Sequence, residues 1–139
     1  MPEPDSWRER RTDAAAERER ALNRRRAEES SQARTLLLAF VAEAEGRGIA
    51  PVPLRARSYD GRHRYRTTSA GWYLRRNESV AVARDGAFYV LGVPTSLRAL
   101  FTGVELVPSD PPLVLGKGGR DGESIDLPDA LALVLERES

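Results

Sequence analysis

Cysteine is absent from this 139-residue chain, which excludes disulfide bonds, thiolate metal sites and cysteine nucleophiles. Long apolar runs are absent too, because the longest, Leu36–Ala42, is far shorter than the roughly 20 residues that a membrane-spanning helix needs. The acidic segment Met1–Asp5 has no apolar core and does not have the pattern of a secretory signal peptide. We therefore expect a cytoplasmic protein that has no membrane partner.

Residues suited to catalysis are scarce. His63 is the one histidine of the chain, and no two carboxylates stand out as a pair for acid–base chemistry. A Ser–His–Asp arrangement with Ser58 and Asp60 would have to form within one predicted turn, which has no nucleophile-elbow signature. We predict no catalytic residue and no cofactor, and we expect a binding protein rather than an enzyme.

The charges that are present lie unevenly along the chain. Residues 1–47 carry ten basic and ten acidic side chains, whereas residues 48–98 carry nine basic and three acidic ones, a net charge of +6. Residues 99–139 carry three basic and eight acidic side chains, a net charge of −5. This asymmetry favours either an anionic partner or two segments of the chain that neutralise each other.

The N-terminal third has the pattern of one long helix. Ser6–Glu9 is a capping-box signature, and no proline or glycine follows until Gly46. We expect a helix from near residue 7 to about residue 45. Residues 1–31 are polar on all sides and form a charged helical arm, and residues 32–139 form one domain. An apolar stripe predicts that the second half of the helix packs on this domain, and it consists of Ala33, Leu36, Leu37, Phe40, Val41 and Ala44.

The remainder reads as short strands and two helices. Asp85-Gly86 between apolar segments 79–83 and 88–91 predicts a hairpin, and a strand at 71–75 would extend it to a three-stranded meander. A short helix is expected at 94–101, capped by Thr95 or Ser96, and a last helix begins near Asp126. Segments 104–107 and 113–115 are expected to be strands. The predicted fold is therefore α+β: a long N-terminal helix, a small antiparallel β-rich body, a short helix and a C-terminal helix.

A second predicted hairpin, 53–67, turns at Asp60-Gly61 and carries most of the basic charge. A two-residue turn predicts the opposed pairs Tyr59–Arg62, Arg57–Arg64 and Arg55–Arg66, all on one face of the sheet. Like charges that lie opposite each other are destabilising, so we expect an anion to relieve them. The candidate nucleic-acid-binding residues are Arg55, Arg57, Arg62, Arg64, Arg66, Arg75, Arg76, Tyr59 and Tyr65.

Three alternatives compete with this interpretation. The acidic segment of the chain itself, with Asp121, Glu123, Asp126 and Asp129, would neutralise the arginines if it packed against them. The arginines would instead extend into water, or a register slip of one residue would disperse them between the two faces. The aromatic residues have an alternative as well, because Trp72 and one of the tyrosines are needed in a core with few other large apolar groups.

A glycine-rich segment, 116–122, is the second candidate site. Backbone N–H groups of a glycine-rich loop, together with the side chains of Lys117 and Arg120, are of the kind that bind phosphate. The segment matches neither a P-loop nor a dinucleotide-binding fingerprint. Asp121, Glu123 and Asp126 supply oxygen ligands, but the calcium-loop spacing is absent, and we predict no metal site. The candidate anion-binding residues are Lys117, Gly118, Gly119 and Arg120.

Three segments carry a resemblance to known sequences. They are Gly71–Arg76, Asp85–Leu91 and Gly118–Ser124, and with them residues 34–135 resemble small uncharacterised proteins from high-GC actinobacteria. The resemblance implies no activity and no site residues.

Taken together, these patterns favour a non-enzymatic accessory protein that presents an arginine-rich sheet face to a polyanion, most plausibly nucleic acid. The alternative is a protein–protein interaction module, or a homo-oligomer, that acts through the N-terminal helix. A third reading is a small enzyme that uses the glycine-rich loop 116–122.

Overall fold

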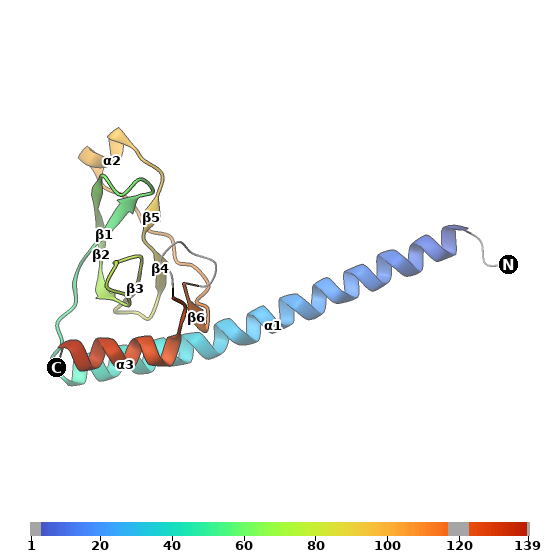
Figure 1. Cartoon of the computed structure of the whole chain (residues 1–139), viewed down its shortest axis with the longest axis horizontal. Helices are drawn as coiled ribbons and strands as arrows, with labels where there is room; N and C mark the ends of the chain where they lie inside the picture. Colours follow the sequence, from blue (N-terminus) through green and yellow to red (C-terminus); the bar gives the residue numbers. More distant parts are fainter. Residues whose placement is uncertain (1–3, 117–122, 139) are drawn as a thin grey trace.

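The computed structural model describes residues 4–116 and 123–138 and shows the expected α+β architecture (Figure 1). A 43-residue helix, α1 (Pro4–Gly46), projects beyond the rest of the molecule at its N-terminal end. A five-stranded sheet stands over its C-terminal part, and a second helix, α3 (Leu127–Glu138), lies beside that part. No helix in the described residues is long and apolar enough to cross a membrane.

The two halves of α1 differ as their sequences predict. The apolar stripe is buried in the second half, with Ala33, Leu37 and Ala44 fully inaccessible to solvent. Polar contacts tie this half to the body, because Arg34 pairs with Asp110 at 2.6 Å and the carboxylate of Glu29 accepts a hydrogen bond from the backbone of residue 113. The helix therefore continues into solvent on the N-terminal side of residue 29.

The sheet has the order β4-β3-β2-β1-β5. Strands β2, β3 and β4 form the predicted antiparallel meander, and β1 pairs with β2 in the predicted hairpin. Strand β5 adds to the free edge of β1 in parallel, a pairing that the sequence did not indicate. The strands are β1 (Val52–Ser58), β2 (Arg64–Tyr73), β3 (Val80–Ala83), β4 (Phe88–Val90) and β5 (Gly92–Val93).

Two strand predictions require correction. The expected strand at 71–75 is not separate, because its first residues are the C-terminal end of the ten-residue β2. The expected strand at 104–107 does not form: Val104 makes only an isolated bridge to Thr67. The segment passes over the hairpin instead, where Val104 and Leu106 cover buried residues of β1 and β2.

A bulge bends the long strand β2. Pro53 of β1 pairs with Ala70, but Arg55 pairs with Arg66, so residues 67–69 of β2 lie opposite the single residue 54. Side chains satisfy the backbone groups that this irregularity releases: the Thr67 hydroxyl donates to the carbonyl oxygen of residue 54 at 2.7 Å, and the hydroxyl of Tyr73 accepts from the N–H of Arg55 at 3.0 Å. Strand β2 therefore pairs with β1 on both sides of the bulge, and at its C-terminal end Gly71 pairs with Val52 of β1 and with Ala83 of β3.

The smaller elements follow their local signals. The β3–β4 loop has Gly86 at a φ of 86°, which fits the three-residue hairpin with a left-handed glycine. Helix α2 (Leu97–Thr102) begins at Ser96, whose hydroxyl accepts a hydrogen bond from the N–H of Ala99. Strands β6 (Val114–Leu115) and β7 (Ile125–Asp126) pair and lead into α3, which buries the predicted stripe of Leu127, Ala130, Leu131 and Val134.

The core has parts on both faces of the sheet. The larger part joins the α1 stripe, α3 and residues such as Trp72, which lies edge-on to Phe40 with ring centroids 6.0 Å apart. The indole N–H of Trp72 donates to the carbonyl of Ile49, so Trp72 is a core residue, as the alternative reading of the aromatics expected. Of the two smaller parts, one joins Leu54 of β1 to buried residues of β3 and β4 such as Ala81. The other lies beneath the β1–β2 hairpin and consists of Ala56, Tyr65 and Ala99.

Candidate functional site

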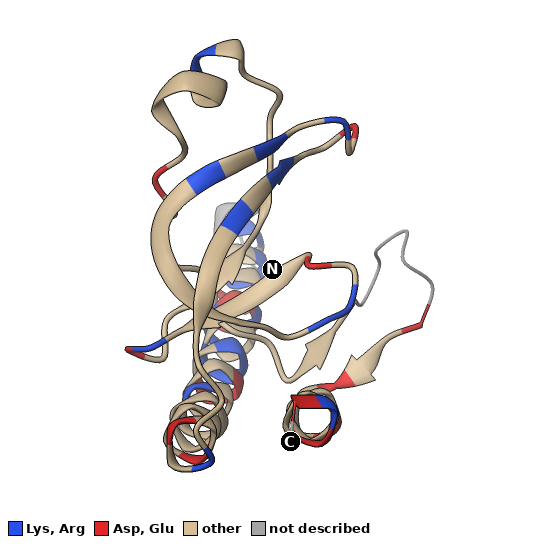
Figure 2. Cartoon of the chain, turned by 90° about the vertical axis from the view of Figure 1, so that its left-hand side faces the viewer, with Lys and Arg blue, Asp and Glu red and all other residues tan. Residues whose placement is uncertain are grey.

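The β1–β2 hairpin has the register that the sequence predicts for its arginines. Arg55 lies opposite Arg66, and Arg57 lies opposite Arg64. We call these four residues the arginine face. Arg57 is half-buried and the other three are exposed. Figure 2 shows their positions as basic bands that lie side by side on the two strands of the hairpin.

The opposite side of the same strands is closed to solvent. Leu54 and Ala56 are fully buried, and Tyr65 is 1% exposed. The hydroxyl of Tyr65 accepts a hydrogen bond from the backbone N–H of Ser96 at 3.0 Å, which ties the hairpin to the start of α2. The prediction of Tyr65 as a nucleic-acid-binding residue is therefore wrong, because its buried ring is a core element that holds α2 in place.

The tip of the hairpin differs from the predicted two-residue turn. The ladder ends at the Arg57–Arg64 pair, and the N–H of Ser58 donates to the carbonyl of His63, so residues 59–62 form the loop. Tyr59 does not pair with Arg62, because its N–H donates to the carbonyl of Val93 in β5. The ring of Tyr59 lies against Gly92 and remains 75% exposed.

Asp60 organises this loop. Its carboxylate accepts hydrogen bonds from the Ser58 hydroxyl at 2.5 Å and from the N–H of Arg62 at 2.9 Å. These bonds, the Ser58 bond first, hold the pKa of Asp60 below its ordinary value of 3.8. The backbone N–H of His63 donates a hydrogen bond to the Ser58 hydroxyl, and the His63 ring stacks on the Tyr65 ring. The three residues therefore form a structured turn, in which the His63 ring is placed against Tyr65.

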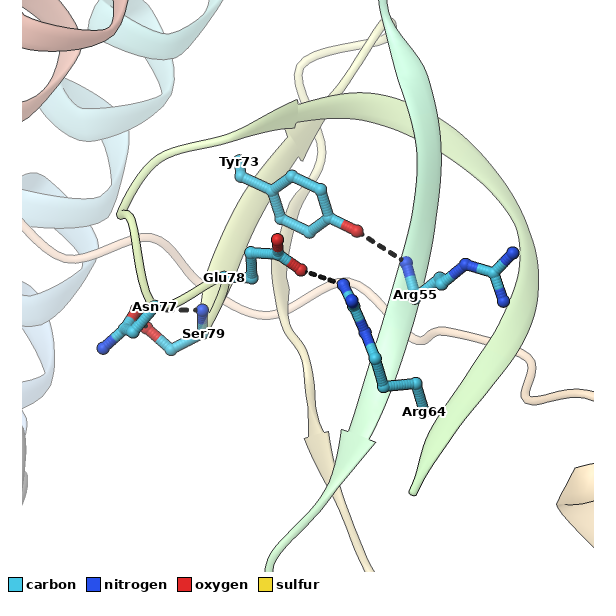
Figure 3. A network of polar contacts seen from close by, with 6 residues as sticks. All are labelled: Arg55, Arg64, Tyr73, Asn77, Glu78 and Ser79. Atoms are coloured by element: carbon cyan, nitrogen blue, oxygen red, sulfur yellow. Dashed lines mark hydrogen bonds and ion pairs between the residues drawn. The ribbon is translucent and has the colours of Figure 1, made fainter. Parts of the chain in front are cut away.

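Among the described residues, one acidic side chain forms an ion pair with the arginine face. The carboxylate of Glu78, in the turn between β2 and β3, forms an ion pair with Arg64 (Figure 3). Arg66 donates to the backbone carbonyl of Phe101 at 3.3 Å. Within the described part of the chain, the guanidinium groups of Arg55, Arg57 and Arg62 form no ion pair. In the described residues, most of the positive charge of the hairpin is thus without an acidic partner.

The acidic C-terminal segment does not neutralise this face in the described residues. Glu123 contacts Arg75 through its backbone carbonyl, and Asp126 and Asp129 stand at the start of α3. Asp121 lies outside the described residues. The neutralising contact comes from Glu78 in the β2–β3 turn, which pairs with Arg64.

Glu78 also has an unusual backbone, because its φ of 57° lies in the left-handed region that favours glycine and asparagine. Asn77 next to it closes the turn by accepting hydrogen bonds from the N–H and hydroxyl of Ser79 (Figure 3). A glutamate in such a position costs of the order of 1 kcal/mol. No signal in the sequence places this residue near Arg64, which lies 14 residues earlier in the chain.

The structure separates Arg75 and Arg76 from the arginine face. Both lie in the β2–β3 turn and line a groove of about 760 Å³ against α3. Arg75 is turned toward the backbone carbonyls of Leu115 and Glu123, so it braces the β6–β7 unit. Arg76 is exposed.

The glycine-rich candidate site is not tested by the structure. Lys117, Gly118, Gly119 and Arg120 lie outside the described residues. Among residues 4–116 and 123–138, no group of three or more histidine, aspartate or glutamate side chains is placed to hold a metal ion.

Comparison with known proteins adds no relative: no protein-family model, curated protein or solved structure matches the chain.

Proposed function

We propose that this protein is a non-enzymatic nucleic-acid-binding protein and that the arginine face contacts the phosphate backbone. The observation that carries the proposal is the register of the hairpin, which sets two arginines of β1 directly against two of β2. The only acidic side chain that pairs with these four in the described residues is Glu78. A phosphate placed between opposed arginines would relieve their repulsion and accept several charge-assisted hydrogen bonds.

The spacing of the face suits an extended polyanion rather than a single small ion. Along each strand the two arginines are two residues apart, which corresponds to about 7 Å, because a strand rises about 3.4 Å per residue. Arg62 on the hairpin loop adds a further exposed cation beyond Arg64. A row of this kind binds successive phosphates, and such binding releases counterions and weakens with salt.

The direct test is fluorescence anisotropy of labelled nucleic acid over a range of salt concentrations. In the first variant all four residues of the arginine face are changed to glutamine. We expect its affinity to fall and its plot of log affinity against log salt to become shallower by about 3, since each lost phosphate contact removes about 0.7 from the slope on a single strand.

A matched control carries the same change of charge elsewhere: Arg18, Arg20, Arg24 and Arg25 of α1 are changed to glutamine. This variant is expected to keep most of the affinity and the full salt slope. If both variants lose the same amount, the binding reflects net charge and not a site on the hairpin.

The helical arm supports a second candidate function, the binding of a protein partner or a second copy of the chain. Its exposed apolar residues motivate this candidate, because Trp7 and Leu22 are 52% and 47% exposed. Deletion of residues 1–28 removes the arm before Glu29, the residue that contacts the body. The candidate predicts a lower oligomeric mass by light scattering, or loss of a captured partner, while the body still unfolds cooperatively on heating. It fails if neither the mass nor the capture changes.

A further inference from the structure

Helix α2 carries its apolar residues on the outside. Leu97, Leu100 and Phe101 are 74%, 40% and 81% exposed, and their spacing of three and four residues places them on one face of the helix. We call these three residues the apolar tip. Figure 1 shows α2 at the end of the body that lies farthest from α1 and α3. An outward apolar face on so short a helix indicates a contact surface.

The orientation of α2 is fixed by its other face. Ala99, the buried residue of the helix, packs with Ala56 and Tyr65 of the hairpin. Ser96 caps the helix, and its own N–H donates to the Tyr65 hydroxyl. A rotation that buried the apolar tip would break these contacts, so the helix presents the tip to solvent in the folded protein.

Arg66 links the arginine face to the last turn of α2, the helix that carries the apolar tip. The guanidinium group of Arg66 donates to the carbonyl of Phe101, and the N–H of Val104 donates to the carbonyl of Arg66 at 2.7 Å. Gly103 is packed so closely that a Cβ there would lie 2.8 Å from the Arg66 carbonyl oxygen. Arg98 adds an exposed cation on α2 itself. Helix α2 packs on the buried side of the hairpin, and Arg66 and Arg98 bring positive charge to the border of the apolar tip.

We propose that the site takes single-stranded nucleic acid, whose bases rest on the apolar tip while its phosphates lie on the arginine face. This inference rests on the proposed function and narrows its ligand. A single strand exposes the flat faces of its bases to aromatic and apolar side chains, whereas a duplex stacks them inside and offers only their edges. On a duplex the apolar tip would stay in water.

Tyr59 supplies a second stacking surface at the hairpin loop. One side of its ring is covered by Gly92, and the ring is otherwise open at 75% exposure. Tyrosine and phenylalanine rings accept any base, so the geometry predicts a preference for single strands over duplexes without a strong preference for sequence.

An anionic membrane is the competing occupant of an apolar helix bordered by arginines. Two features favour the nucleic acid. The arginine face runs along the hairpin in a row away from α2 and does not ring the tip, and its opposed pairs are spaced along two strands. A flat lipid surface that met the tip would leave much of this row without an anion.

The test uses the full-length protein and a labelled single-stranded DNA, with a hairpin duplex of the same number of nucleotides as competitor. We expect the wild-type protein to prefer the single strand by about tenfold or more, since each stacked base contributes roughly that factor. The double variant Leu97→Ser, Phe101→Ser should lose about tenfold in single-strand affinity. Its salt slope should stay unchanged because the phosphate contacts remain.

Two further variants keep the result interpretable. Leu133→Ser changes a leucine of α3 that is 53% exposed and distant from α2, and it should bind like the wild type. Phe101→Trp keeps a ring that can stack on a base. It should therefore retain the affinity for the single strand that the double variant loses. Thermal unfolding by circular dichroism shows whether each variant is folded.

The outcomes separate this inference from the function on which it rests. Equal affinity for single strand and duplex, with no effect of the double variant, overturns the single-strand proposal and leaves phosphate binding by the arginine face intact. Absence of binding to any nucleic acid overturns both. Binding to vesicles of equal parts phosphatidylserine and phosphatidylcholine that depends on Phe101, together with no preference for the single strand, assigns the tip to lipid and also overturns the proposal.

Discussion

The two faces of the β1–β2 hairpin are made of alternate residues of the same strands, yet they differ in almost every physical property. One face contains Leu54, Ala56 and Tyr65, which are at most 1% exposed. The arginine face, one residue out of step, carries four positive charges toward solvent. The buried face determines the register, because a slip by one residue would carry these arginines into the core.

The comparison shows how a fold can hold like charges together. Repulsion between the arginines destabilises the hairpin only slightly, because water and salt screen exposed charges. Burial of the apolar side chains on the other face stabilises it by more. The packing of the buried face thus fixes the register of the two strands, and this register keeps the arginines opposite each other although they repel.

The largest expected effect comes from breaking the buried face. Tyr65→Ala removes a fully buried ring and leaves the N–H of Ser96 without its acceptor, and we expect a loss of about 3–5 kcal/mol in the free energy of unfolding. Urea denaturation measures it. Tyr65→Phe serves as the control, because it keeps the ring and should lose only about 1 kcal/mol. Equal losses for the two variants would mean that the ring contributes little.

The exposed face should respond in the opposite direction. Arg55→Gln with Arg57→Gln removes one arginine from each opposed pair and should raise the free energy of unfolding by about 0.5 kcal/mol. The gain should be greatest at low salt, where repulsion is least screened. Arg76→Gln with Arg98→Gln changes two exposed arginines outside the ladder and should give no gain. A destabilised Arg55/Arg57 variant would contradict the idea that these pairs repel.

A change of Glu78 tests the exposed face separately, because its carboxylate forms an ion pair with Arg64. Glu78→Gln should lower the free energy of unfolding by less than about 1 kcal/mol, since the Arg64 partner is 47% exposed. It should also tighten nucleic-acid binding a few-fold, because Arg64 becomes available to phosphate. Anisotropy titration tests this, with Glu105→Gln as a control acid on the surface. Weaker binding by Glu78→Gln would show that Glu78 positions Arg64 for the ligand.

The smallest effect concerns the loop at the tip of the hairpin, which joins β1 to β2. The pKa of Asp60 is lowered chiefly by the Ser58 hydroxyl, so its contribution to stability is present above the ordinary value of 3.8 and is lost as the pH falls through the lower folded-state pKa. Ser58→Ala should move the pKa of Asp60 back toward 3.8. A carboxyl NMR titration of both proteins measures the shift, and identical midpoints would refute the assigned cause.

Much of the candidate site could be predicted because its signals are local. The alternation of apolar residues and arginines on either side of Asp60-Gly61 was enough to pair Arg55 with Arg66 and Arg57 with Arg64. The same reasoning failed at Tyr59, because the N–H that a simple hairpin turn would use is bound to β5, more than 30 residues later. It also assigned Tyr65 to the site although its own strand position lies on the buried face.

The apolar tip shows the other limit. The spacing of Leu97, Leu100 and Phe101 is visible in the sequence, and an apolar face on a helix normally points inward. Only the packing of Ala99 and the Ser96 cap against Tyr65 reverses it. The left-handed turn at Glu78 is similar, since its contact with Arg64 depends on where the β2–β3 turn falls relative to the hairpin.

The sequence by itself determined the long helix, its buried stripe, the two hairpins, the cap of α2 and the register of the arginines. Each of these depends on residues a few positions apart, whose spacing sets which face they share. The tertiary structure alone decided that β5 completes the sheet, that Glu78 and not the acidic segment meets Arg64, and that α2 turns its apolar residues to solvent. These features depend on contacts between distant segments, where the burial of one side chain determines which neighbour remains exposed.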